Sequence, residues 1–300
     1  MTNTYHLNRF LLAVATAISF TMFWFLGSWF NIPGHRGFNA SLLAQSGAVV
    51  NVLLVAIAVV VSVVFCTLVA GSVRTDAGLF CTALGLMALS LRSGPMRYTL
   101  FDAGRSVFFA LAVELFLLLA ILSAGWIVVI FMRNLGLSRQ VDRDFQPTQE
   151  DFTQKILATA IQAISTLALV SILCRTDQKA QALASVGVAS MVGSIVAMLI
   201  APTRPSIWYW PGPLLVGLLG YVWASLNPGL LSIGQPAGYF ASLARAVPLD
   251  YASAGTAGAM LGYWFGRAWT SEQEESAASE ASEVPEAPMA ARHRAPRIIQ

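Results

Sequence analysis

The stretch SVFFALAVELFLLLAILSAGWIVVIFM, residues 106–132, decides the fold of this chain. Its one charged side chain is Glu114, and almost every other residue is apolar. An α-helix needs about 20 predominantly apolar residues to cross the roughly 30 Å hydrocarbon core of a bilayer. The stretch is therefore long enough and apolar enough to be a transmembrane helix.

The composition of the whole chain points the same way. Of its 300 residues, 56% are hydrophobic and 11% are charged, and the mean hydropathy is +0.66. An average soluble domain has roughly 25% charged residues. The charges are too few to cover a water-facing surface, which excludes an ordinary soluble enzyme, a disordered protein and a nucleic-acid-binding domain. The net charge of +3 is also too small to indicate a polyanionic partner.

Eight apolar segments are candidates for membrane spans. Three of them are short, so we expect six to eight transmembrane helices. Period-two alternation is absent and the backbone must satisfy its own hydrogen bonds in lipid, so helices are predicted and not barrel strands. The predicted fold is an all-α, polytopic integral membrane helix bundle over residues 1–270. The segments lie near 10–30, 47–71, 77–91, 106–132, 156–174, 180–203, 213–226 and 252–266.

The two ends of the chain and the connection before the last segment lead to three further predictions. The first segment, 10–30, exceeds the roughly 7–15 apolar residues of a cleavable signal peptide, so we expect it to be retained. The connection 227–251 is expected to hold an amphipathic helix that begins at Pro236 and ends before Pro248. The tail, 271–300, is rich in Glu, Ala, Ser and Pro, and we predict that it is disordered.

Glu114 is the one acidic residue inside a predicted span. A charge at a helix centre costs about 2.5–3.5 kcal/mol on insertion scales, so the carboxyl group should face protein or water. It either handles a proton or cation, or it is protonated and bonded to a neighbouring helix. With Asn51 and Gln162, the strongly polar residues of two other spans, it forms our candidate intramembrane polar site. A transport role predicts a polar cavity that Glu114 shares with one of these two residues.

Basic residues cluster after the third segment. Arg92, Arg97 and Arg105 are candidate contacts for anionic lipid headgroups, and Asp102 lies among them. If the three guanidinium groups converge beside a groove open to the headgroups, a lipid-headgroup enzyme becomes a plausible function.

Small residues recur every four positions in two spans. Gly258, Gly262 and Gly266 do so in the last one, and residues 185, 189, 193 and 197 do so in the sixth. Such ladders let helix backbones approach closely. They predict helix packing and say nothing about function.

The triplet Arg-Thr-Asp occurs at 74–76 and again at 175–177, each time where one span ends and the next begins. An inverted repeat of the kind found in many transporters would place the triplets in this way. Tight helical hairpins also favour Arg at a helix end and Thr or Asp at a helix start. The repeated triplet therefore has a purely local explanation as well.

Motifs for metal, phosphate or nucleophilic chemistry are missing from the sequence. Cys66, Cys81 and Cys174 have neither zinc-ligand nor redox spacing, and the three histidines lie outside the spans. No phosphate-binding loop, zincin helix or nucleophile elbow occurs. We therefore expect no metal and no cofactor, and the balance is against an enzyme.

Three functions remain open for a multi-pass protein of a bacterial-type inner membrane. The function that we expect is a non-enzymatic scaffold or a subunit that binds other membrane subunits, because buried polar groups are few, packing motifs are abundant and the soluble loop is modest. The alternatives are a small transporter or channel, and the headgroup enzyme. If all eight segments span, eight basic residues outside the tail fall on the N-terminal side and seven on the other. This small excess favours both termini in the cytoplasm.

The lipid environment is directly testable. After ultracentrifugation of broken cells without detergent, we expect the whole polypeptide in the membrane pellet. Recovery in the supernatant would contradict the membrane assignment.

Overall fold

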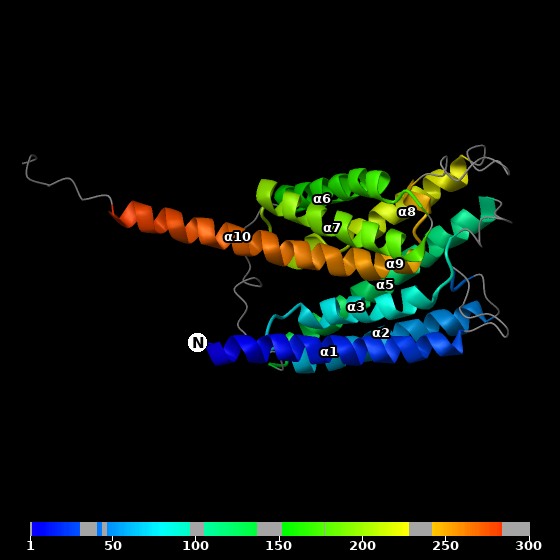
Figure 1. Cartoon of the computed structure of the whole chain (residues 1–300), viewed down its shortest axis with the longest axis horizontal. Helices are drawn as coiled ribbons and strands as arrows, with labels where there is room; N and C mark the ends of the chain where they lie inside the picture. The colour runs from blue at the N-terminus through cyan, green and yellow to red at the C-terminus, as the bar shows by residue number, and fades with distance from the viewer. Residues whose placement is uncertain are drawn as a thin grey trace, which may run out of the picture.

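The computed structural model describes residues 2–30, 41–43, 47–96, 105–136, 152–176, 178–227 and 242–283. Within these residues the chain is an all-α bundle without β-strands (Figure 1), as predicted. Eight helices longer than one turn make up the bundle. They are α1 (Thr2–Trp29), α2 (Ala48–Ala70), α3 (Ala77–Arg92), α5 (Arg105–Asn134), α6 (Phe152–Leu173), α7 (Lys179–Ile200), α8 (Gly212–Leu226) and α10 (Thr256–Glu283).

Five of these helices are long and apolar enough to cross a membrane, namely α1, α2, α5, α6 and α7. They coincide with the five long segments of the sequence. The three short segments are helical too, and Figure 1 shows α3, α8 and the first part of α10 running beside the long helices. At 1.5 Å per residue, the 15 residues of α8 cover about 22 Å, less than the hydrocarbon thickness.

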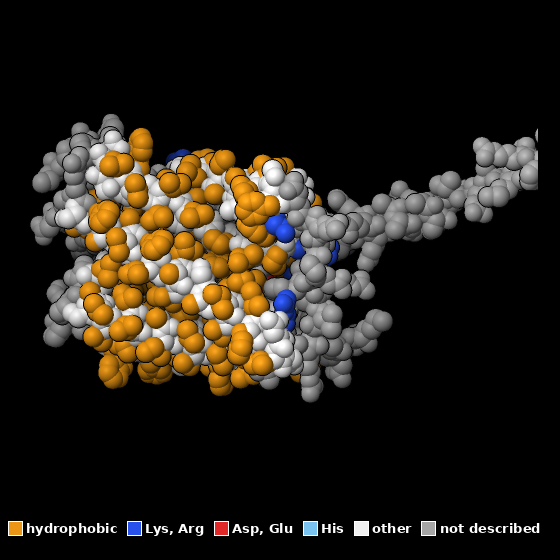
Figure 2. All heavy atoms as spheres, turned by 180° about the vertical axis from the view of Figure 1, so that it is seen from behind, with side chains coloured by type: hydrophobic (Ala, Val, Ile, Leu, Met, Phe, Trp, Pro, Cys, Tyr) orange, Lys and Arg blue, Asp and Glu red, His pale blue; other side chains and the backbone are white. Residues whose placement is uncertain are grey.

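The surface of the bundle is apolar where a soluble protein would be polar. On α5 alone, Phe109, Phe116 and Ile127 expose 63%, 59% and 66% of their area. Figure 2 shows one face covered by apolar side chains, with basic side chains gathered at one end. A soluble monomer rarely exposes so large a contiguous apolar surface, so this surface belongs in lipid.

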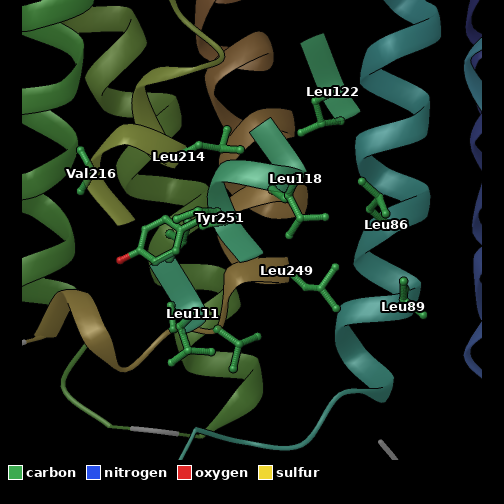
Figure 3. Packing of buried hydrophobic residues seen from close by; sticks show 14 of the residues in the cluster. Leu86, Leu89, Leu111, Leu118, Leu122, Leu214, Val216, Leu249 and Tyr251 are labelled. Carbon is green, nitrogen blue, oxygen red and sulfur yellow. The ribbon is translucent and has the colours of Figure 1, made fainter. Parts of the chain in front are cut away.

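The interior joins all the helices into one core. Leu86 of α3, Leu118 of α5, Leu214 of α8 and Leu249 belong to a single buried cluster (Figure 3). Helix α1 packs against α2 and α3, α7 packs between α6 and α10, and α5 packs chiefly against α8 and α2. If the chain contained two copies of one helical unit, α5 would correspond to α1. It would then pack against the two helices that follow it in the chain, as α1 does. Its observed neighbours therefore give no support to an inverted repeat.

The last part of the chain differs from expectation at two places. Pro248 begins a helical turn, α9 (Pro248–Asp250), instead of ending a helix, because its fixed φ and missing N–H suit the first helical position. A π-helical turn, η6 (Tyr251–Gly255), then leads into α10. The predicted amphipathic helix lies partly outside the described residues, and the described part holds a 3₁₀ turn, η5 (Ser242–Ala244).

Helix α10 also continues to Glu283, into the segment that we expected to be disordered from residue 271. Ala and Glu are good helix formers, and the packed first half of α10 removes the cost of nucleating the second half. Residues 284–300 of the expected tail lie outside the described residues.

The glycine ladder of α10 lies against α7. A Cβ atom on Gly258 would lie 2.2 Å from the carbonyl oxygen of Gly187, and one on Gly262 would lie 2.1 Å from that of Met191. At Gly266 the nearest atom would be the Met198 Cβ, at 2.8 Å. The backbones of the two helices thus touch without intervening side chains, as in other small-residue helix pairs.

This contact predicts the effect of enlarging the ladder. Gly262→Leu should separate α7 from α10 and lower the free energy of unfolding by about 1–3 kcal/mol or more, the usual cost of overpacking. Unfolding by sodium dodecyl sulfate in mixed micelles measures this value. Ala168→Leu, at an exposed position of α6, is the control and should be neutral. Equal stability of the two variants would contradict the close packing.

Candidate functional site

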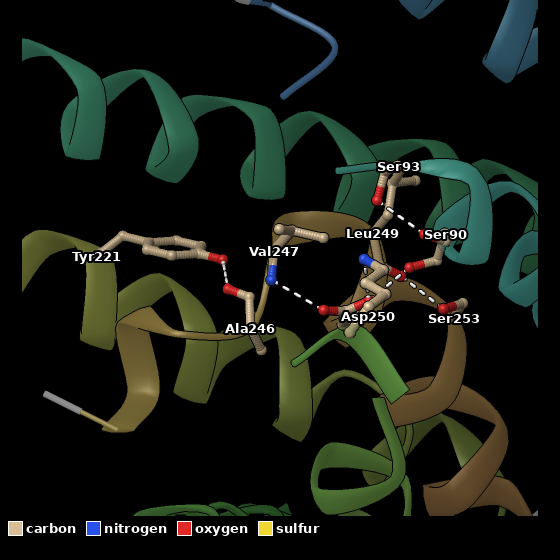
Figure 4. A network of polar contacts seen from close by, with 9 residues as sticks. Ser90, Ser93, Tyr221, Ala246, Val247, Leu249, Asp250 and Ser253 are labelled. Carbon is tan, nitrogen blue, oxygen red and sulfur yellow. Dashed lines mark hydrogen bonds and ion pairs between the residues drawn. The ribbon is translucent and has the colours of Figure 1, made fainter. Parts of the chain in front are cut away.

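Residues 242–255 connect α8 to α10 through irregular backbone that is mostly buried. Buried backbone N–H and C=O groups that are not bonded within a regular helix need hydrogen-bond partners elsewhere in the protein. Two tyrosine hydroxyl groups supply them. Tyr221 of α8 donates to the carbonyl of Ala246 (Figure 4), and Tyr251 donates to the carbonyl of Leu243 at 2.8 Å.

Arg245 ties the same segment to the end of α6. Its Nη1 atom donates to the carbonyl oxygens of Cys174, at 3.2 Å, and Arg175. The last carbonyls of a helix have no partners within the helix and carry partial negative charge, so a guanidinium group is well placed there. The Arg245 residue is 6% exposed, which makes it part of the interior and not of the polar surface.

Asp250 is the centre of the polar network. It is completely buried. One carboxylate oxygen, Oδ2, accepts from the Val247 backbone N–H at 3.0 Å, and the other, Oδ1, accepts from the Ser90 hydroxyl group (Figure 4). The bond to Val247 closes the first turn of α9, as the acidic residue of a capping box does. The bond to Ser90 joins this turn to α3.

Lys179 completes the bonding of Asp250. Its Nζ atom lies 2.6 Å from Oδ1, and the two side chains are 15% and 1% exposed. Lys179 is the first residue of α7. A cation is unfavourable at a helix N-terminus, where the dipole is positive, so the Asp250 carboxylate offsets this repulsion as well as the burial of the ammonium group.

Glu114 lies in the same neighbourhood. It is 1% exposed, and its Oε2 atom accepts from the Ser41 hydroxyl group and from the Leu43 backbone N–H at 3.3 Å. Its other oxygen, Oε1, has no hydrogen-bond partner among the described residues. The ammonium group of Lys179 lies within electrostatic range of this carboxyl group. One buried carboxyl group, that of Asp250, thus pairs with Lys179, and a second, that of Glu114, lies within electrostatic range of it.

This charge cluster, Glu114, Lys179 and Asp250, is suited to holding a proton. With all three groups ionised the cluster has one excess negative charge, which is costly in a buried site. One proton on Glu114 removes that excess. Ionisable groups inside membrane bundles commonly form proton or ion pathways. The π-helical turn that follows Asp250 is of a kind that is frequent at functional sites.

The other two members of the predicted intramembrane site make no described hydrogen bond to Glu114. Asn51 is half-buried in the first turn of α2. Gln162 is buried in α6, where its Nε2 atom donates to the Thr166 hydroxyl group at 3.2 Å and its amide lies against Gly212. The hydrogen bonds described for Glu114 come from Ser41 and Leu43, and not from these two residues.

Of the three predicted headgroup arginines, Arg92 is described in full. Its Nη1 atom donates to the Trp24 carbonyl and to the Ser28 hydroxyl group, both at 2.9 Å. Its guanidinium carbon lies 5.2 Å from the centre of the Trp24 ring. Arg97 and the side chain of Arg105 lie outside the described part of the chain.

Lys179 and Asp250 are the site residues that the sequence did not identify. Each precedes an apolar run by one or two positions, so each is naturally interpreted as a loop charge at a membrane boundary. One pattern would have suggested Lys179 and Asp250. It is a charge directly at the edge of one apolar run together with an opposite charge at the edge of another. Their pairing joins positions 71 apart in the chain, which local patterns do not encode.

Within the described residues no group of three His, Cys, Asp or Glu side chains is arranged to hold a metal ion. Comparisons with protein-family models, curated proteins and solved structures found no match. The function is therefore argued from the residues of this chain.

The buried pair predicts a strong mutational effect. Lys179→Met leaves Asp250 without its cation and should lower the free energy of unfolding by about 3–5 kcal/mol, the usual cost of breaking a buried pair. Lys179→Met combined with Asp250→Asn removes both charges and should recover most of the loss. Unfolding by dodecyl sulfate in mixed micelles compares the two. A double variant as unstable as the single one would contradict a direct interaction.

Proposed function

We propose that this chain is a small proton-coupled transporter that passes several times through a bacterial-type inner membrane. The charge cluster of Glu114, Lys179 and Asp250 is its proton-binding site. The observation that carries the proposal is the state of Glu114, a buried carboxyl group with one oxygen that lacks a hydrogen-bond partner among the described residues.

A purely structural role would need fewer charges. One carboxylate is sufficient to compensate Lys179, and Asp250 already lies 2.6 Å from its ammonium group. A second buried carboxyl group, Glu114, adds a desolvation cost, and its described hydrogen bonds come from Ser41 and Leu43 and from no cation. Such a group is favourable only when it carries a proton, or when Lys179 moves toward it.

The helix next to the cluster contains a π-helical turn. Helices α9, η6 and α10 follow one another without a break, and Asp250 is the last residue before the π-helical turn. Turns of this kind are frequent at functional sites.

The burial of two cations supports the orientation with both termini in the cytoplasm. Lys179 and Arg245 belong to the seven basic residues on the side opposite the termini, and each is engaged inside the protein. When these two residues are left out of the count, the excess of basic residues on the N-terminal side is larger. The positive-inside rule assigns the side with the excess to the cytoplasm.

The other two functions have less support. A scaffold or partner subunit was favoured by the apparent scarcity of buried charge, and the cluster removes that reason. A headgroup enzyme needs converging arginines, whereas Arg92 is engaged with Trp24 and Ser28 of its own chain.

The proposal predicts charge movement driven by a pH step. We expect a transient current when proteoliposomes on a solid-supported membrane are exposed to a rapid pH change, because protons enter or leave the cluster. Glu114→Gln cannot bind this proton and should lose at least nine-tenths of the current.

Asp76→Asn is the matched control, since Asp76 is a third buried carboxyl-bearing residue, in a different setting. It accepts from the Trp264 indole N–H at 3.0 Å and pairs with Arg74. This variant should keep the current. Wild-type protein without a current, or a current unchanged in Glu114→Gln, would refute the proposed proton site. Gel filtration of every variant verifies that it is folded.

A further inference from the structure

An apolar groove of about 420 Å³ runs along the bundle between α3, α7 and the start of α10. Helix α3 contributes large side chains at helical spacing, Phe80, Leu84, Met87 and Leu91. The other helices contribute many small residues, including Ala184, Gly187 and Ala257, and these leave the hollow. Leu91 and Val188 at its border are 45% and 48% exposed, so the groove opens on the lipid-facing surface. Its volume falls within the roughly 300–1,000 Å³ typical of small-molecule sites.

The length of the groove fits a hydrocarbon chain in one leaflet. From Phe80 to Leu91 the helix rises by about 16 Å at 1.5 Å per residue. Half of a roughly 30 Å hydrocarbon core is about 15 Å. The groove therefore runs along the bundle for about the depth of one leaflet.

The charge cluster lies at one end of this groove. Three parts of the chain, namely α3, α7 and the turn before α10, contribute residues both to the groove and to the ion-pair network. In each part the groove residue lies close in the chain to the network residue. Leu91 follows Ser90, Ala180 follows Lys179, and Ala254 lies one helical turn beyond Asp250.

The member of the cluster that is most open to a bound molecule is the ammonium group of Lys179. Lys179 is the most exposed member of the cluster at 15%, whereas both carboxyl-bearing residues are buried. An ammonium group has three N–H donors, and the bond to Asp250 uses one of them. Both oxygens of Asp250 already accept hydrogen bonds. The N-terminus of α7 adds the positive end of its helix dipole at the same point.

We infer that the groove binds a single-chain amphiphile with an anionic head, of the long-chain fatty acid type. The hydrocarbon chain lies along α3 and α7, and the carboxylate accepts from Lys179 at the end of the groove. In naming this molecule as the substrate, the inference rests on the proposed transport function. The binding itself does not depend on that function.

The test uses the full-length protein in dodecyl maltoside and tritiated palmitate in a scintillation proximity assay at pH 8.5. We expect saturable binding. Unlabelled hexadecanol and hexadecyltrimethylammonium should compete at least tenfold more weakly than unlabelled palmitate, because they have the same chain without the negative head.

Two variants separate the groove from the head site. Ala184→Phe fills the groove from an exposed position of α7 and should weaken palmitate binding at least tenfold. Ala168→Phe, exposed on α6 away from the groove, should bind as the wild type does. Lys179→Met with Asp250→Asn removes the ion pair without leaving either partner unpaired, and should bind palmitate no better than hexadecanol.

Three results would overturn the inference. They are the absence of saturable palmitate binding, equal affinity for the uncharged or cationic chain, and unchanged binding by Ala184→Phe. The pH-step currents are recorded without palmitate, so the two proposals can fail separately. Currents without palmitate binding would refute the ligand class alone. Palmitate binding without currents would refute proton coupling and leave the groove as an amphiphile site.

Discussion

The constraint on which this structure depends is that hydrocarbon offers no hydrogen bonds. Every polar group inside the bundle must find its partner within the chain. Long apolar helices satisfy this requirement locally through their own backbone. The irregular segment 242–255 cannot, and it is bonded instead by Tyr221, Ser90, Lys179 and the carbonyls at the end of α6, with Arg245 supplying the donor. The polar contacts around Asp250 thus follow from the structure of this segment.

The same segment links the charge cluster to the groove. Asp250 lies on it, and Ala254, which lines the groove, lies on the π-helical turn that follows. Ser90 with Leu91 on α3, and Lys179 with Ala180 on α7, repeat this adjacency of a polar residue and a groove residue. A molecule that moves these elements apart also changes the distance between Lys179 and its carboxylates. Occupation of the groove and protonation of the cluster therefore have a direct physical route to influence each other, as coupling between two sites requires.

The close approach of α7 and α10 gives this region a rigid frame. Gly258 and Gly262 place the backbone of α10 directly against Gly187 and Met191. Backbone contact leaves little freedom for the two helices to slide, whereas the groove beside them is lined by side chains that can change rotamer. Motion at the site is then expected in the segment 242–255 and in the side chains that border the groove, while the paired helices stay together.

The amino-acid sequence by itself determined the fold class, the position of the long helices, the isolation of Glu114 in an apolar helix and the glycine ladder of α10. These features depend on composition and on spacing within one helix, where the period of 3.6 residues links sequence directly to geometry. The tertiary structure alone decided that Lys179 and Asp250 are a buried pair and that Ser41 and Leu43, and not Asn51 or Gln162, supply the described hydrogen bonds of Glu114. It also decided that α10 begins after a π-helical turn. These outcomes depend on which helices become neighbours, and that choice is made by the packing of whole surfaces, in which residues far apart in the chain meet and local pattern carries no information about the partner.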